Sequence, residues 1–209
     1  MKIIHLIAAF VFLVPSAFGA ERNSRTEYSA IGTHVANPDR AAAMVGRNQY
    51  KLRKLLSAKS DEIFNGNPDQ AFRLAVDSTV LYVVPLEYAA AQLFLTDSCA
   101  VGVMDKSEQV LDARSTFNAE ELSWTCDGLS GIGFRRSVEY PTIIDVLVVY
   151  QGRPPSNKAG DLFSYPVKLT YDMSRRALSV DQELSRYLRN NNVNDVKVGF
   201  KLLSTRRRP

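Results

Sequence analysis

The acidic residues best suited to catalysis gather between two cysteines. They are Asp105, Glu108, Asp112, Glu120 and Glu121. A pair of carboxylates hydrolyses glycan or ester bonds when a buried setting raises one of the two pKa values. The same spacing is typical of solvated helix faces and helix caps. A hydrolase using these carboxylates is therefore the alternative hypothesis, and we assign no catalytic residue.

The sequence contains few of the residues that bind metal ions or activate a nucleophile. The chain has two histidines: His5 lies in the apolar start of the chain, and His34 lies in a polar stretch. There is no HExxH pair and no CxxC, and a serine or cysteine nucleophile would have only His34 as a base. We predict no metal, no cofactor and no catalytic triad.

Cys99 and Cys126 are the two cysteines of the chain. An even number in an exported protein most simply indicates one disulfide, which stabilises by roughly 3 to 4 kcal/mol in the chain-entropy model. A free thiol nucleophile is the alternative. A structural disulfide is the prediction.

A glycine-rich stretch follows Cys126, at residues 127–133, and Arg135 and Arg136 come after it. Backbone amides and two guanidinium groups can cradle an anion. The stretch lacks the lysine of a P-loop, however. We therefore interpret it as a flexible turn beside the disulfide.

Several other residues are candidates for contact with a partner. Trp124 is predicted to pack on the disulfide, with an exposed anchoring role as the alternative. Arg153 lies in a polar, proline-containing loop at residues 151–161, which is a contact element or a solvated connection. Arg206, Arg207 and Arg208 form a basic tail at residues 205–209, either a solubilising end or a contact for an anionic membrane surface.

The formal charge of +4 comes from Lys2 and these three arginines, since the other charges balance. That balance argues against nucleic acid as a partner.

The first residues are typical of a secretory signal. Lys2 precedes an apolar run at residues 3–14, and the small residues Ala17 and Gly19 suit cleavage after Gly19. A membrane anchor is the alternative, but the run is shorter than the roughly 20 residues of a spanning helix. We predict a signal peptide at residues 1–19, no later transmembrane segment, and a periplasmic or secreted protein.

The predicted order along the chain begins with a flexible arm at residues 20–36 and continues with a single domain at residues 37–204. Asn37-Pro38-Asp39 starts a helix of about six turns, and Asn67-Pro68-Asp69 starts a second one, so that the two form a hairpin. Short helices are expected at 107–113 and 118–124.

The remaining segments favour strands. These are 79–84, ended by Pro85, then 100–104, 142–150, 162–172, 177–180 and 195–203, with a helix at 181–189 before the last. Residues 86–95 fit a helix or a hairpin. The short connections near the end predict antiparallel pairing. The fold class is therefore α+β, with an N-terminal helical hairpin packed on a mostly antiparallel sheet and one disulfide.

The sequence specifies a fold clearly but contains no convincing set of catalytic residues. The leading functional hypothesis is based on that lack. We expect an exported, non-enzymatic binding or accessory protein of the periplasm or extracellular space that contacts another protein through loops at one edge of the sheet.

Overall fold

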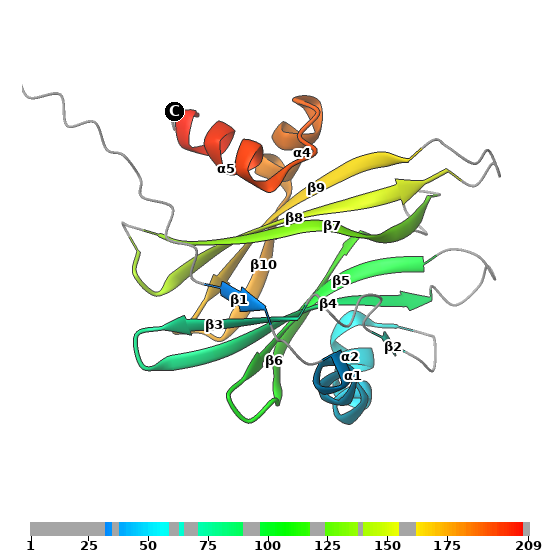
Figure 1. Cartoon of the computed structure of the whole chain (residues 1–209), viewed down its shortest axis with the longest axis vertical. Helices are drawn as coiled ribbons and strands as arrows, with labels where there is room; N and C mark the ends of the chain where they lie inside the picture. Colours follow the sequence, from blue (N-terminus) through cyan, green and yellow to red (C-terminus); the bar gives the residue numbers. More distant parts are fainter. Residues whose placement is uncertain are drawn as a thin grey trace, which may run out of the picture.

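The protein is built in layers, with two antiparallel sheets packed face to face and helices on their outer faces (Figure 1). The computed structural model describes residues 32–34, 38–58, 63–64, 71–89, 97–117, 124–137, 140–154 and 162–206. Within these residues the α+β class, the antiparallel pairing and the single disulfide are confirmed.

The first sheet consists, in spatial order, of β1 (Gly32–His34), β3 (Phe72–Val76), β4 (Thr79–Ala89), β5 (Asp97–Asp105) and β6 (Val110–Phe117), with β2 (Ile63–Phe64) paired to β4. The second consists of β10 (Ala177–Asp181), β9 (Phe163–Asp172), β8 (Ile143–Arg153) and β7 (Thr125–Arg136). The first sheet packs against α1 (Pro38–Arg47) and α2 (Gln49–Leu56), and the second against α4 (Gln182–Asn190) and α5 (Val196–Thr205). β1 lies in the segment for which a flexible arm is predicted.

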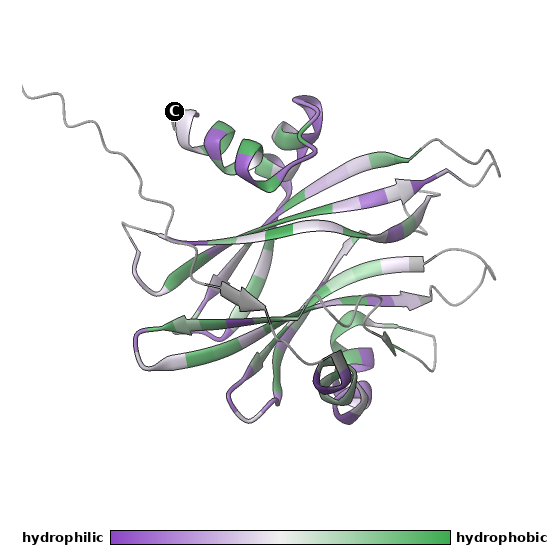
Figure 2. Cartoon of the chain, viewed as in Figure 1, coloured by the Kyte–Doolittle hydropathy of each residue, from purple (hydrophilic) through white to green (hydrophobic). Residues whose placement is uncertain are grey.

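Side chains that point alternately to the two faces of each strand fill the space between the sheets and the space beneath the helices. On β8, Ile144, Val146 and Val148 belong to the central core, whereas Leu147 belongs to the core beneath α4 and α5. On β4 of the first sheet, likewise, Leu81 and Val83 belong to the central core, whereas Val84 belongs to the core beneath α1 and α2. Since successive side chains of a strand point to opposite faces, each sheet is buried on both sides. Hydrophobic colouring accordingly follows the middle of the strands, and the turns at their ends are hydrophilic (Figure 2).

The predicted six-turn helix is wrong, because the chain breaks at Asn48 into α1 and α2. Asn48 is buried, and its amide nitrogen donates to the carbonyl oxygens of Met44 and Glu108, at 2.7 Å and 2.8 Å. Its side-chain oxygen accepts from the Val110 amide at 3.1 Å. Binding β6 in this way competes with regular helix geometry. α2 ends at Leu56, and the next residue, Ser57, has a left-handed backbone conformation with a φ of 50°.

The second helix of the predicted hairpin is contradicted at Phe72–Val76, which forms β3; residues 65–70 lie outside the described residues. Leu74 and Val76 are buried while Arg73 and Ala75 are exposed, so the period is two rather than 3.6. Tertiary pairing with β4 overrides the helix start signal.

Pro85 does not end its strand, which continues to Ala89. Pro85 pairs with Val101 of β5 on one side. On the other side, β3 reaches only Val83 and β2 begins only at Glu87. Proline has no N–H group to donate. In the described chain Pro85 lies between the segments of β4 that pair with β3 and β2, so the lack of this donor breaks no pairing there.

One of the two short helices predicted within the disulfide loop is wrong, and the other lies almost wholly outside the described residues. The helix expected at 107–113 is instead a turn followed by β6, in which Asp105 Oδ1 accepts from the amides of Ser107 and Gln109. The helix expected at 118–124 lies outside the described residues except for Trp124.

Near the C-terminus, β8, β9, β10 and α4 confirm the predicted strands and helix. The last predicted strand is wrong, because residues 196–205 form α5. Asp195 caps this helix by accepting from the amides of Lys197 and Val198, at 2.8 Å and 3.0 Å. Val196 and Phe200, four residues apart, then share one face toward the second sheet.

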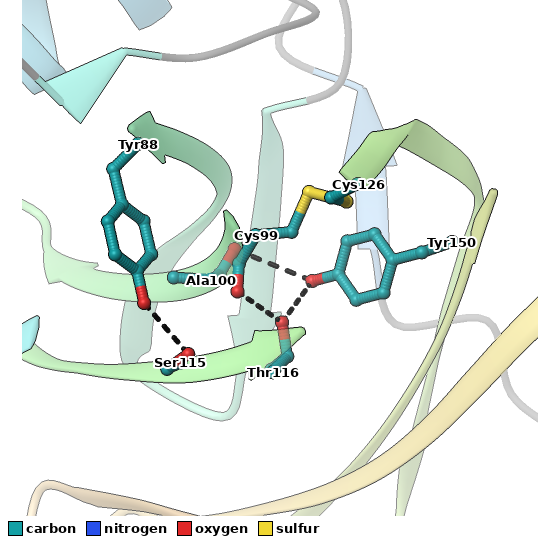
Figure 3. The surroundings of a disulfide bond; sticks show 7 residues. All are labelled: Tyr88, Cys99, Ala100, Ser115, Thr116, Cys126 and Tyr150. Carbon is teal, nitrogen blue, oxygen red and sulfur yellow. Dashed lines mark hydrogen bonds between the residues drawn. A yellow bond between two sulfur atoms is a disulfide. The ribbon is translucent and has the colours of Figure 1, made fainter. Parts of the chain in front are cut away.

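The disulfide joins the two sheets, since Cys99 lies on β5 and Cys126 on β7, with their Cα atoms 6.0 Å apart (Figure 3). Beside it, the Thr116 hydroxyl lies 3.1 Å from the Cys99 carbonyl oxygen and 2.7 Å from the Tyr150 hydroxyl. Burial raises the pKa of Tyr150, which therefore remains a neutral phenol.

We predict that the double variant Cys99→Ser/Cys126→Ser loses roughly 3 kcal/mol in its free energy of unfolding, because the unfolded chain gains the freedom that the cross-link removes. Urea denaturation followed by circular dichroism measures this loss. Reduced native protein serves as the control and should match the variant. An unchanged midpoint in both would contradict the stabilising role.

Candidate functional site

The glycine-rich stretch that predicts a flexible turn is in fact part of β7. Gly128 has a φ of 110°, and the pairing register with β8 shifts on either side of Leu129. Further along, Gly131 and Gly133 meet α5. A Cβ atom on Gly133 would lie 2.3 Å from Val196 Cγ1 and 3.0 Å from Phe200 Cε2. Glycine at this position lets the helix approach the strand closely.

A groove of about 680 Å³ lies where β7, α5 and β3 meet. Among the described residues its lining is mainly apolar and comprises Phe72, Gly131, Ile132, Gly133, Phe134, Asp195, Val196, Lys197, Phe200 and Lys201. Four consecutive residues of β7 therefore line it. Because neighbouring residues of a strand point to opposite faces, such a lining places the groove along the edge of β7 rather than over one face.

That edge of β7 has no strand partner among the described residues, since β7 pairs only with β8. The opposite edge of the same sheet, at β10, is covered. There the Leu178 amide donates to Asp112 Oδ2 at 2.8 Å, and Arg114 Nε donates to the Leu178 carbonyl oxygen at 2.9 Å. The sheet thus has one edge covered by side chains of β6 and one edge facing a groove.

The walls of the groove differ in character. Phe72 and Phe134 form the wall nearest the first sheet, with ring centroids 5.5 Å apart. The other wall is α5, where the exposed residues Lys197 and Lys201 stand four positions apart on one side of the helix. Within the described chain neither lysine forms an ion pair. The Asp195 carboxylate is occupied by the first amides of the helix.

An ionic cluster of one buried and two half-buried side chains lies next to the groove. Asp145 of β8 lies 2.7 Å from Lys168 Nζ and 2.9 Å from Arg135 Nη2. The guanidinium of Arg135 also lies 5.4 Å from the ring centroid of Phe200, which lines the groove. The cluster therefore joins β7, β8 and β9 beneath the helices.

The pKa values of this cluster follow from burial and pairing. Burial disfavours ionisation of Asp145, but attraction to Lys168 and hydrogen bonds from Lys168 and Arg135 outweigh it, and the pKa of Asp145 is lowered. Burial lowers the pKa of Lys168 despite the attraction of Asp145. Because Lys168 is 3% exposed, removing its partner would leave a charge without compensation.

The arginines singled out in the sequence are placed apart from one another. Arg135 belongs to the ionic cluster, whereas Arg136 binds Asp77 at 2.7 Å. Arg153 binds Asp127 at 2.7 Å. Both Arg135 and Arg136 are thus paired with carboxylates, which weakens the hypothesis of an anion cradle.

One arginine of the predicted tail packs on the fold. Arg206 follows α5, pairs with Glu183 of α4 at 2.6 Å and stacks over the Tyr187 ring at 4.8 Å. Arg207 and Arg208 lie outside the described residues.

Trp124 is half-buried and packs against the core that contains the disulfide. It meets Phe163 edge to face, with centroids 4.3 Å apart. Both rings line a pocket of about 510 Å³ together with Ser164, Tyr165, Arg189, Asn192 and Asn194. This pocket is separate in its lining from the groove at β7.

The described acids of the disulfide loop have separate partners. Asp105 holds a turn, Glu108 pairs with Arg40 and Arg47, and Asp112 binds the edge of β10. Glu120 and Glu121 lie outside the described residues. Among the described residues, no group of three or more metal-ligating side chains could hold a metal ion. None of the helices described is long and apolar enough to cross a membrane.

Comparison with protein-family models, curated proteins and solved structures gave no match. The groove is therefore identified as a candidate site from its geometry alone.

Sequence reasoning singled out the glycines of β7 but missed the other wall of the groove, because α5 was expected to be a strand. The signal that identifies this helix is Asp195 as a cap before Val196 and Phe200 at helical spacing.

We predict that Gly133→Ala lowers the free energy of unfolding by about 1 to 3 kcal/mol, since the new methyl group must displace Val196 or Phe200. Gly46→Ala is the matched control. Its Cβ atom would meet nothing within 4 Å, so we expect a gain of about 0.5 kcal/mol from helix propensity. Thermal and urea denaturation measure both. Equal effects of the two substitutions would refute the close packing of α5.

We predict that Asp145→Asn lowers the free energy of unfolding by about 3 kcal/mol at neutral pH, because Lys168 is left buried without its counter-charge. The lowered pKa of Asp145 means that its stabilising effect is present above the ordinary value of 3.8 and is lost as the pH falls below it. The difference between native protein and variant should therefore shrink in acid.

The double variant Asp145→Leu/Lys168→Met is the control for this cluster. It removes both charges, so it should lose much less stability than Asp145→Asn. A double variant as unstable as the single one would show that the charges themselves are not the cause.

Proposed function

We propose that this is an exported binding protein that holds a segment of another protein in the groove between β7 and α5. The observation that carries the proposal is the position of an apolar groove along a strand edge that has no partner strand in the described chain. Concave, mainly apolar sites with a few polar groups at the rim are typical of ligand and peptide sites.

The groove also changes which part of the fold we expect to make contact. The sequence favours loops at one edge of the sheet, whereas the groove is formed by a strand, a helix and the aromatic side chain of Phe72. Regular elements present a more fixed surface than loops do. A fixed surface reduces the ordering cost of binding.

Export is the second part of the proposal. It rests on the pattern of a signal peptide at residues 1–19 and on the disulfide between Cys99 and Cys126, a bond that persists in oxidising compartments. We propose the periplasm or the extracellular space as the site of action.

Site-specific photo-crosslinking tests the groove. A benzophenone amino acid replaces Lys201, which lines the groove, in the protein carrying its native signal. We expect a discrete cross-linked protein of higher mass, which mass spectrometry then identifies.

Val198 provides the matched control position, since it lies on the same helix, is 53% exposed and does not line the groove. The same cross-linker at Val198 should give no such product. Equal products from both positions, or none from Lys201, would contradict binding in the groove.

A further inference from the structure

Resting on the proposed function, we infer that the bound segment is an extended strand that pairs with the edge of β7 and is apolar on both of its faces, with an acidic residue beside the groove's lysines. Each of these three properties follows from a separate observation on the groove.

Pairing follows from the backbone of β7. In an antiparallel pair, every second residue directs its N–H and C=O groups away from its partner. Residues 131–134 pair with β8 on one side, and the groove runs along their other side. About two residues of this stretch therefore offer a donor and an acceptor to an added strand, as in recognition by β-strand addition.

The apolar character follows from the two walls. The side chains of an added strand would alternate between the two faces of the sheet. Those on one face would meet Val196 and Phe200, and those on the other would meet Phe72 and Phe134. A run of about four apolar, preferably β-branched, residues fits these surroundings.

The acidic residue follows from Lys197 and Lys201. Like charges four residues apart on a helix repel one another, which destabilises the helix by a few tenths of a kcal/mol. An incoming carboxylate would offset that repulsion. In the described chain no ion pair joins either lysine to an acidic side chain, and the nearby Asp195 carboxylate accepts from the helix amides. Charge complementarity therefore favours an acidic partner.

Synthetic peptides test this inference directly. The probe is a fluorescein-labelled peptide of about eight residues, with a core of valine and isoleucine flanked by glutamates, titrated with mature protein in fluorescence polarisation. Replacing the glutamates by lysines should weaken binding roughly tenfold or more, and salt should weaken binding of the acidic form.

Methylation of peptide nitrogens decides whether the peptide pairs as a strand. Two peptides carry N-methyl groups on alternate residues, in the two possible registers. Only one register faces β7, so one peptide should lose affinity roughly tenfold or more and the other should not. Equal affinities would overturn strand pairing.

Variants of the protein separate this inference from the proposed function. Lys197→Glu/Lys201→Glu should reverse the preference to the basic peptide. Lys54→Glu/Lys106→Glu, at two exposed lysines that do not line the groove, is the control and should not. If no peptide binds but cross-linking at Lys201 succeeds, the inference about the bound segment is wrong and the proposal of binding in the groove is retained. Failure of both overturns the groove as well.

Two other occupants are distinguished in the same experiment. If the peptide binds only after deletion of residues 20–30, the groove belongs to the protein's own N-terminal segment, and the inference is overturned. If sedimentation shows a dimer that the peptide dissociates, the occupant is a second copy, which overturns it equally.

Discussion

The burial of both sheets on both faces is the constraint on which the rest of the structure depends. β8 shows it most clearly, because Val146 and Leu147 are both fully buried although they point in opposite directions. An apolar sheet face must be covered by another layer. Helices α1 and α2 supply the layer over the first sheet, and α4 and α5 supply the layer over the second.

Covering the second sheet with α4 and α5 has two chemical consequences. The polar residues that lie beneath these helices must find partners, which explains the pairing of Lys168 with Asp145. The helix must also come close to β7, which requires glycine at position 133. Together these contacts fix α5 beside a strand edge, and the groove is the space that remains.

Natural proteins protect exposed strand edges, because an unpaired edge invites association with other chains. Here Asp112 and Arg114 cover the edge of β10. The edge of β7 is treated differently, since it is flanked by Phe72, by α5 and by two lysines. The proposal of binding at β7 is based on this asymmetry between the two edges of one sheet.

The sequence by itself determined the α+β class, the disulfide, the antiparallel C-terminal strands and α4, because apolar-rich runs, the short connections between them and an even cysteine count are local or countable signals. Only the tertiary structure decided the break at Asn48, the strand at Phe72–Val76, the helix at Val196–Thr205 and the strand β7. In these segments local signals compete: a helix start precedes the period-two pattern of Phe72–Val76, and apolar residues typical of a strand follow the Asp195 cap. Contacts with residues distant in the chain determine the outcome. The groove was unpredictable for the same reason, since its walls come from segments that only packing brings together.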